Sequence, residues 1–168
     1  MNNLIIYFSR RGENYLNGSL VNFEVGNAEV LVEHIKEFID ADTFQVETKE
    51  SYPDSYMETI EIAKKEQENN VYPELKEYLD DISQYDTIYI VSPNWWGTLP
   101  MPLQGQLKQL DFTGKTVKTL ITHEGSGLGN SMKDIKKLCN GADIKDGLDI
   151  KGSDVQKAKD EIKEWIEY

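Results

Sequence analysis

Five apolar runs of strand length alternate along the chain with segments of helical periodicity. The runs cover residues 3–9, 44–48, 87–92, 116–122 and 143–150. Strands that alternate with helices form parallel βαβ units, in which helices cover both faces of the sheet. The pattern therefore predicts one α/β domain over residues 1–168, with three layers and a doubly wound, five-stranded parallel sheet. The weak, alternating run at 143–150 is expected to lie at an edge of this sheet.

The expected helices follow from apolar residues three or four positions apart. Three such segments lie at residues 31–39, 57–63 and 100–114. Pro73 is expected to open a shorter helix that extends to Ile82, because proline is favoured in the first turn of a helix. The last helix is expected to begin with a capping box, in which Ser153 and Gln156 satisfy each other's free amides.

Acidic residues outnumber basic ones, and the excess is concentrated in the first half of the chain. The net charge is −12, and residues 47–86 hold 12 acids against 4 bases, whereas residues 87–168 hold 11 of each. A field of this sign disfavours nucleic acid and anionic membranes as partners and favours a basic partner protein. The alternative is a solvated helix face that only confers solubility.

The single cysteine, Cys139, excludes an internal disulfide and is typical of a reducing compartment, so a cytoplasmic location is expected. It shares a helical pattern with Met132 and Ile135, which favours a buried structural thiol over a reactive one. The apolar runs are shorter than a membrane span requires, and residues 1–8 lack the basic segment and cleavage site of a signal peptide.

Two unusual loops directly follow buried-strand signals. Segment 92–102 has the sequence Ser-Pro-Asn-Trp-Trp-Gly-Thr-Leu-Pro-Met-Pro, and segment 123–129 has the sequence His-Glu-Gly-Ser-Gly-Leu-Gly. Ligands of open parallel sheets bind outside the carboxyl ends of the strands. Aromatic rings and glycine-rich backbone at adjacent strand ends would form a flat slot, which is the shape that a planar heterocycle with polar edges requires.

The loop after the first strand has the composition of a phosphate site. Residues 9–15 follow that strand, and the Gly-Asn-Ala segment at 26–28 stands just before the first helix. A helix N-terminus attracts phosphate through its free amides and its dipole. Neither G-x-G-x-x-G nor G-x-x-x-x-G-K-[ST] is present, which disfavours a dinucleotide and excludes a P-loop NTPase. A single phosphate on a smaller nucleotide remains.

Together these segments resemble the flavodoxin family, and more narrowly a bacterial branch with a long first loop. The resemblance rests on the Tyr-Phe-Ser-Arg start, the Gly-Asn pair, the Trp-Trp-Gly loop and the His-Glu-Gly-Ser-Gly loop, and it covers nearly the whole chain. It implies the sheet order 2-1-3-4-5 with FMN at the switch point, for which flavodoxin is itself the type example. It also implies that the 5′-phosphate binds at the first loop and that the isoalloxazine ring lies between the two later loops.

Five residues of the first loop are candidate phosphate contacts, of which Ser9, Asn27 and Ala28 follow from the resemblance. They are Ser9, Arg11, Asn14, Asn27 and Ala28. Ala28 stands where the family usually has a hydroxyl residue, and residues 10–25 resemble an insertion. Arg11 and Asn14 are candidates for the missing donor, since a guanidinium suits phosphate well. Alternatively, the turn at residues 12–14 surrounds the phosphate, and Gly26 and Asn27 only cap the helix.

The two later loops supply the remaining candidate cofactor contacts. They are Pro93, Asn94, Trp95, Trp96, Gly97, His123, Glu124, Gly125, Ser126, Gly127 and Gly129. One of the two tryptophans is expected to stack on the flavin and the other to fill the gap between helix and sheet, and the sequence leaves both assignments open. His123 either contacts the flavin or hydrogen-bonds the neighbouring loop. His34 is expected at the surface, and Tyr52 and Tyr56 are expected to contribute to packing.

The resemblance implies an FMN-binding electron carrier of low potential, in which the flavin performs the redox chemistry. No catalytic residue and no metal ligand is nominated. Acidic surroundings lower the potential and steer basic redox partner proteins towards the site. The alternative is an NAD(P)H-dependent quinone or flavin reductase that uses the same bound FMN. A phosphotransfer receiver domain is disfavoured, because Ser9 and Asn94 stand near the places where it requires acidic residues.

Overall fold

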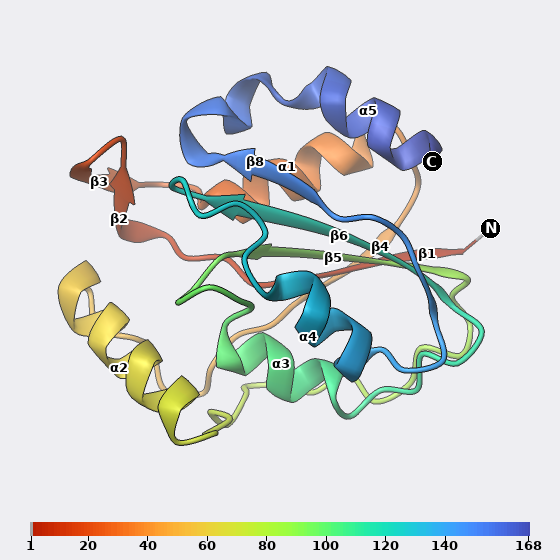
Figure 1. Cartoon of the computed structure of the whole chain (residues 1–168), viewed down its shortest axis with the longest axis horizontal. Helices are drawn as coiled ribbons and strands as arrows, with labels where there is room; N and C mark the ends of the chain where they lie inside the picture. Colours follow the sequence, from red (N-terminus) through yellow and green to blue (C-terminus); the bar gives the residue numbers. More distant parts are fainter. Residues whose placement is uncertain (1) are drawn as a thin grey trace.

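A parallel β-sheet forms the middle layer of the computed structural model, which describes residues 2–168 (Figure 1). Its strand order is β4-β1-β5-β6-β7, and every pair in it is parallel. Four strands of this sheet are β1 (Asn3–Tyr7), β4 (Asp42–Gln45), β5 (Thr87–Pro93) and β6 (Thr116–His123). This is the predicted 2-1-3-4-5 order, so the doubly wound, flavodoxin-like α/β fold is confirmed.

The fifth strand is split into two short pieces. β7 (Asp143–Ile144) pairs with the first two residues of β6, and β8 (Leu148–Lys151) pairs with its last four. Between them the chain passes close to Met132, because a Cβ on Gly147 would lie 2.6 Å from the Met132 sulfur. The run predicted at 143–150 is therefore an edge strand with a break.

Helices cover both faces of the sheet (Figure 1). One layer contains α1 (Asn27–Lys36), the 3₁₀ helix η1 (Gly152–Lys157) and α5 (Lys159–Glu167). The other contains α2 (Tyr56–Glu68), α3 (Met101–Leu107) and α4 (Ser131–Leu138). No helix within residues 2–168 combines the length and the apolar character that crossing a membrane requires.

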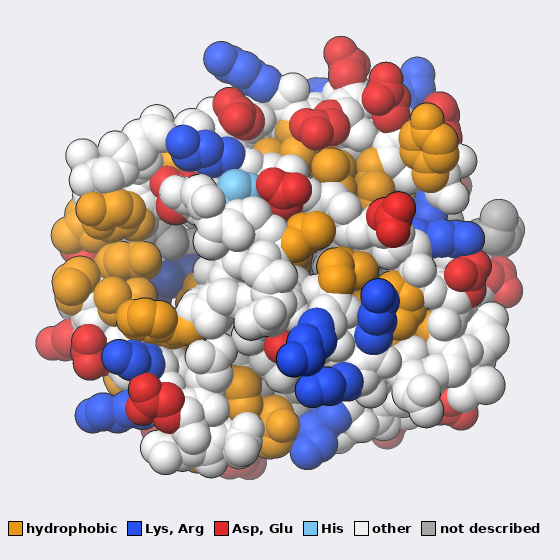
Figure 2. Space-filling model, in the orientation of Figure 1, with side chains coloured by type: hydrophobic (Ala, Val, Ile, Leu, Met, Phe, Trp, Pro, Cys, Tyr) orange, Lys and Arg blue, Asp and Glu red, His pale blue; other side chains and the backbone are white. Residues whose placement is uncertain are grey.

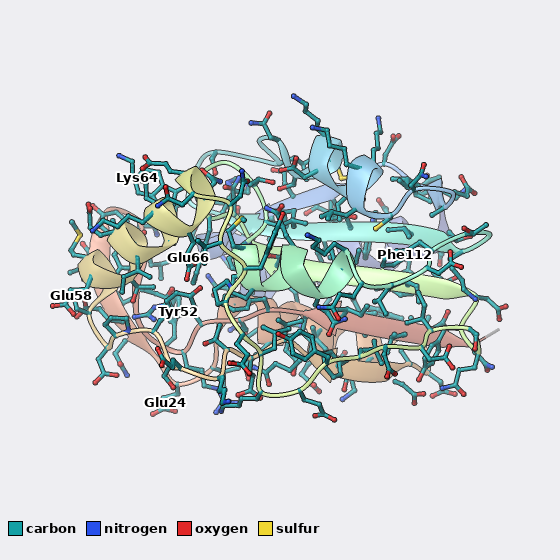
Figure 3. The ribbon with its side chains drawn as sticks, turned by 90° about the horizontal axis from the view of Figure 1, so that it is seen from below. Glu24, Tyr52, Glu58, Lys64, Glu66 and Phe112 are labelled. Carbon is teal, nitrogen blue, oxygen red and sulfur yellow. The ribbon has the colours of Figure 1, made fainter. Side chains whose placement is uncertain are left out.

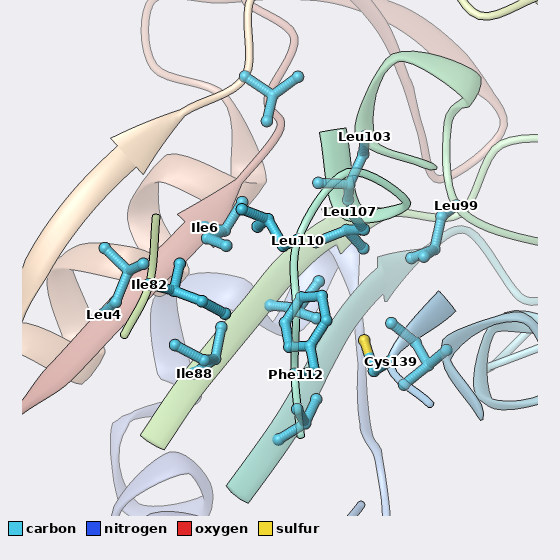
Figure 4. Close-up of a cluster of buried hydrophobic side chains, with 14 of the residues drawn as sticks. Leu4, Ile6, Ile82, Ile88, Leu99, Leu103, Leu107, Leu110, Phe112 and Cys139 are labelled. Carbon is cyan, nitrogen blue, oxygen red and sulfur yellow. The ribbon is translucent and has the colours of Figure 1, made fainter. Parts of the chain in front are cut away.

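Each face of the sheet has its own apolar core. On the α3 and α4 side, Phe112 is 1% exposed and belongs to a cluster with Leu103, Leu107 and Ile88 (Figure 4). On the opposite side, buried residues of α1 and α5 pack on the sheet. Because both faces are covered, β5 and β6 are almost continuously apolar or β-branched, as is typical of central parallel strands.

The predicted insertion at residues 10–25 contains an antiparallel hairpin outside the main sheet. Its strands are β2 (Gly12–Leu16) and β3 (Ser19–Phe23). Asn17 and Gly18 form the two-residue turn, with φ angles of 51° and 83°, which are the left-handed values of a type I′ turn. The Asn-Gly pair is the sequence signal from which this hairpin could have been predicted.

The prediction of a helix that begins at Pro73 is wrong, since the described chain forms no helix between α2 and β5. Its backbone groups find partners elsewhere. Lys76 N donates to Glu47 O at 3.0 Å, and the fully buried Gln106 side chain bonds both the amide and the carbonyl of Leu79. Long-range hydrogen bonds therefore replace the local ones that the proline and the apolar spacing suggested.

Two further predictions are wrong. His34, expected at the surface, is 6% exposed, and its Nε2 lies 3.0 Å from the carbonyl oxygen of Val155. This contact joins α1 to η1. The capping box predicted at Ser153 does not form, because that residue lies inside η1 without a side-chain capping bond and α5 begins only at Lys159.

The first testable prediction concerns Cys139, which is fully buried just after α4, as expected. Burial raises the pKa of its thiol to about 12. The thiolate is the reactive form. We therefore expect the native protein to react with the disulfide reagent DTNB at mildly alkaline pH far more slowly than the chain unfolded in urea. Equal rates in the two states would contradict the buried position.

Candidate cofactor site

A cavity of about 280 Å³ opens at the carboxyl ends of β1, β5 and β6. Ten of the sixteen predicted contacts line it: Ser9, Asn14, Asn27, Ala28, Pro93, Asn94, Trp95, His123, Glu124 and Ser126. The other six do not line it: Arg11, Trp96, Gly97, Gly125, Gly127 and Gly129. The chain runs from β1 to β4 on one side of β1 and then crosses to β5 on the other side. The cavity therefore lies at the switch point of the sheet, between β1 and β5.

The two ends of the first loop meet at the N-terminus of α1. Gly26 is the N-cap residue, and a Cβ there would lie 2.0 Å from Ser9 Oγ. Ser9 Oγ is buried and has no hydrogen-bond partner among the described residues. A buried hydroxyl without a partner is costly, so this oxygen is available to a ligand at the first turn of α1. This geometry favours the Gly26 end of the loop over the turn at residues 12–14 as the phosphate position.

Arg11 has a partner of its own. Its Nε and Nη2 donate to the Glu29 carboxylate at 2.9 and 2.7 Å, and its side chain is 66% exposed. The Arg11 guanidinium is the main cause that holds the pKa of Glu29 below its usual value, and the hydrogen bond from the Gly26 amide lowers it further. The nearby Ser9 hydroxyl acts in the same direction, although its geometry is not that of a hydrogen bond. Arg11 would therefore have to leave Glu29 before it could replace the hydroxyl missing at Ala28.

The loop after β5 is a tight turn. Trp95 N donates to Thr98 O at 2.8 Å, and the two central residues, Trp96 and Gly97, have φ angles of 55° and 85°. These are again the values of a type I′ turn. A left-handed φ is unfavourable for tryptophan. The Trp96 indole is held in place by its Nε1, which donates to Ile60 O at 2.8 Å.

This turn sends the two tryptophans in different directions. Trp95 lines the cavity and packs edge-on against Phe8 and Tyr52, with ring centroids 5.0 and 5.3 Å apart. Trp96 is 45% exposed and lies against α2, where Lys64 Nζ is 5.2 Å from its ring centroid. Trp95 is therefore the tryptophan that a planar ligand in the cavity would contact.

Asn94 joins the second loop to the third. Its Oδ1 accepts a hydrogen bond from Gly97 N at 2.8 Å, and its Nδ2 donates to Gly127 O at 3.1 Å. Gly129 passes so close that a Cβ would lie 2.4 Å from Gly97 O, and its φ angle is 53°. The predicted glycines of these loops therefore fix how the loops pack on each other.

His123 hydrogen-bonds its own loop and also reaches the cavity wall. Its Nδ1 accepts from Gly125 N at 2.9 Å, so Nε2 carries the proton and donates to Asp149 Oδ2 at 2.9 Å. The side chain is only 8% exposed, yet it lines the cavity. The loop hydrogen bond that the sequence allowed is present, and the ring remains within reach of a ligand.

The β2–β3 hairpin supplies a wall that was not predicted. Tyr15 and Phe23 line the cavity, and Tyr15 stacks on Tyr56, with centroids 5.7 Å apart and an interplanar angle of 27°. At the tip of the hairpin, Asn17 N donates to Glu124 Oε1 at 2.9 Å. The hairpin is therefore joined to α2 on one side and to the third loop on the other.

Arg10 holds the base of this hairpin. Its Nε donates to Glu13 O at 3.0 Å, and its Nη2 donates to Pro53 O and Asp54 O at 3.1 and 3.0 Å. Burial is the main cause that lowers the pKa of Arg10. Arg10 also lines the cavity, so it adds a positive charge near a wall to which Glu124 contributes a negative one. Neither Arg10 nor Tyr56 was predicted as a contact, since each is brought to the site by residues distant in sequence.

A doubly wound parallel sheet with a cavity at its switch point and a buried hydroxyl at a helix N-terminus defines a mononucleotide-binding type of α/β protein. The chain matches the family model described as flavodoxin over residues 19–168, and it belongs to the flavodoxin family. No curated protein matches the chain.

Several solved structures share this fold. A provisionally assigned flavoprotein of Bacteroides uniformis is 22% identical, with a TM-score of 0.75 over 99% of this chain and 98% of that one. A Lactobacillus acidophilus flavoprotein in complex with FMN is 22% identical, with a TM-score of 0.63 over 93% and 97%. A Fusobacterium nucleatum flavodoxin bound to FMN is 15% identical, with a TM-score of 0.56 over 99% and 96%. At these identities the likeness concerns the fold.

The second prediction tests the junction between the two later loops. Replacing Asn94 by alanine should lower the free energy of unfolding by about 1–3 kcal/mol, because Gly97 N and Gly127 O both lose their partner. Urea unfolding followed by circular dichroism measures this. The matched control is Asn140→Ala, at an exposed position, which should have little effect. Equal losses in both variants would show that Asn94 does not hold the loops together.

Proposed function

We propose that this cavity binds FMN and that the protein is a low-potential electron carrier. Membership of the flavodoxin family supports this, as do the FMN complexes of two proteins with the same fold. The observation that carries the proposal is the Ser9 hydroxyl, buried at the first turn of α1 and unpaired within residues 2–168. A terminal phosphate oxygen is the partner that such a hydroxyl, flanked by free helix amides, would bind best.

The residues of the cavity fit the parts of FMN. Ser9 and the first-turn amides of Asn27 and Ala28 would hold the phosphate, although Ala28 contributes no hydroxyl. Trp95 would stack on the isoalloxazine ring, and the His123 loop would lie at an edge of it. Bound FMN supplies the exchange of one or two electrons. The protein orients the ring and limits the access of water.

The charge around the cavity supports a low potential. Glu124 lines the cavity, and Glu29 lies at the N-terminus of α1, where its carboxylate accepts a hydrogen bond from the Gly26 amide. Arg11 offsets Glu29, and Arg10 adds a positive charge to the cavity lining, but the protein as a whole carries a net charge of −12. Negative charge raises the energy of a ring that gains an electron, so it favours donation over acceptance.

The surface near the site favours a basic partner protein. On α2, the exposed apolar side chains of Met57 and Ile62 surround a shallow depression together with the acidic side chains of Glu58 and Glu61. In Figure 2, hydrophobic side chains gather at the end of the molecule that carries the hairpin and α2. We propose that a basic redox protein docks at this end, where acidic side chains steer it and apolar contacts hold it.

The test of this function begins with the absorbance spectrum of the purified protein and a titration with FMN. NADH and NADPH are then added with and without a quinone. Binding of FMN without rapid oxidation of either nucleotide supports an electron carrier. Rapid turnover of NAD(P)H would instead make the protein a reductase, and failure to take up FMN would contradict the cofactor assignment.

The third prediction tests the phosphate position. Ser9→Ala should weaken the binding of FMN by about 1.5–3 kcal/mol, because it removes a hydrogen bond to a charged group. Riboflavin lacks the phosphate, so its affinity should change little. Quenching of flavin fluorescence measures both affinities. If the two ligands lose affinity equally, the phosphate does not bind at Ser9.

The fourth prediction distinguishes the two tryptophans. Trp95→Ala should weaken FMN by about 1–3 kcal/mol, the size of an aromatic stacking contact. Trp96→Ala should have a smaller effect on FMN, because that indole packs on α2 outside the cavity. Isothermal titration calorimetry with FMN compares the two variants. Equal losses, or a larger loss for Trp96→Ala, would contradict this assignment of the stacking residue.

A further inference from the structure

A second cavity, of about 390 Å³, lies next to the first. It opens where β1 and β4 end, and residues that follow these two strands line most of it. Ser9, Arg10 and Trp95 line both cavities and therefore form the wall between them. Its volume is within the range of sites for small molecules.

The charges at this cavity are the opposite of those of the whole chain. Arg10, Arg11 and Lys76 line it, against a single carboxylate, Glu47. The rest of the protein carries a large excess of acids, since the net charge is −12. A cavity with more cationic than anionic side chains in such a protein is the place where a small anion is attracted rather than repelled.

Two of these cations can contribute to binding a ligand. Lys76 pairs with Glu47 at 3.3 Å, and both side chains are about half exposed, at 54% and 50%. An exposed ion pair of this kind contributes little to stability, so an anion could share Lys76 at little cost to the fold. Arg11 is 66% exposed but binds the largely buried Glu29 carboxylate through Nε and Nη2, so an anion that leaves this pair intact would use the Nη1 group.

The backbone keeps Lys76 at the rim of the cavity. Thr48 and Leu75 form an isolated antiparallel bridge, and Lys76 N donates to Glu47 O at 3.0 Å. This is the same long-range pairing that prevents a helix at Pro73. The ammonium group is thus attached to a segment held in place against the end of β4, rather than to a free loop.

The inner side of the cavity is formed mainly by two aromatic rings, those of Trp95 and Tyr52. Phe8 and Val46 also line it but are 5% and 1% exposed, so they support these rings rather than offer surface of their own. The hydroxyl of Tyr52 donates to Glu66 Oε1 at 2.7 Å, and the two side chains lie together beside α2 (Figure 3). Since that hydroxyl is occupied by Glu66, the Tyr52 ring is what it adds to the cavity lining.

We propose that this second cavity binds a small planar organic anion, namely an aromatic carboxylate of one or two rings. The apolar inner side would contact the ring, and Arg11 and Lys76 would bind the carboxylate at the rim. The proposal rests on the second cavity alone and does not require that FMN binds in the first.

The experiment is calorimetric titration of the purified protein with 2-naphthoate, with and without saturating FMN. We expect one site, weakened by added salt and still able to bind naphthoate when FMN is saturating. The uncharged analogue 2-naphthalenemethanol should bind at least about ten times more weakly, because the rim cations then lose their partner. Complete exclusion of naphthoate by saturating FMN would place the naphthoate in the first cavity and overturn the proposal.

Three variants complete the test. Lys76→Gln should weaken 2-naphthoate about three- to tenfold, as expected for the loss of a charged hydrogen bond. Ser51→Trp places a bulky ring at an exposed position in the lining and should abolish binding. Lys49→Gln is the matched control: its side chain is 64% exposed and pairs with Glu74 outside the cavity, so binding should be unchanged. Equal losses in the two lysine variants, or no binding by the parent protein, would overturn the proposal.

Discussion

Gly26 and Ser9 are in such close contact that a single added carbon at residue 26 would meet the Ser9 hydroxyl. This contact joins the end of β1 to the start of α1 and closes a loop of sixteen intervening residues. The orientation of the helix N-terminus towards the cavity depends on it. The positions of Ser9, Asn27 and Ala28 on one wall follow from the same contact, so a side chain at residue 26 would displace Ser9 or the Arg10 backbone from this wall.

Two carboxylates near this contact accept hydrogen bonds from backbone amides. Glu29 accepts the Gly26 amide and binds Arg11, and Glu124 accepts the amide at the tip of the hairpin. Each carboxylate thereby satisfies a backbone donor and at the same time places negative charge near the cavity. The same side chains that shape the site therefore also set its electrostatic character, so a substitution at Glu29 or Glu124 would change both.

Most of the architecture could be predicted from the sequence, because β-strand and helix periodicities are local signals. The two strand-end loops were found for the same reason, since their residues are contiguous. The absence of a helix at Pro73 could not be predicted from the sequence. The backbone groups of that segment bond Gln106 and Glu47, and both residues are distant in sequence. The choice between Trp95 and Trp96 likewise depends on the left-handed turn at Trp96, which no spacing rule reveals.

The β2–β3 hairpin has a further consequence for the kinetics of ligand exchange. A two-stranded sheet on its own is marginally stable, and within residues 2–168 this one pairs with no strand of the main sheet. Its order depends on a few bonds, at Glu124, Tyr56 and Arg10, and such peripheral units open at a fraction of the free energy of global unfolding. Local opening of the hairpin would therefore widen the first cavity while the core stays folded, so exchange of a ligand there would not require global unfolding.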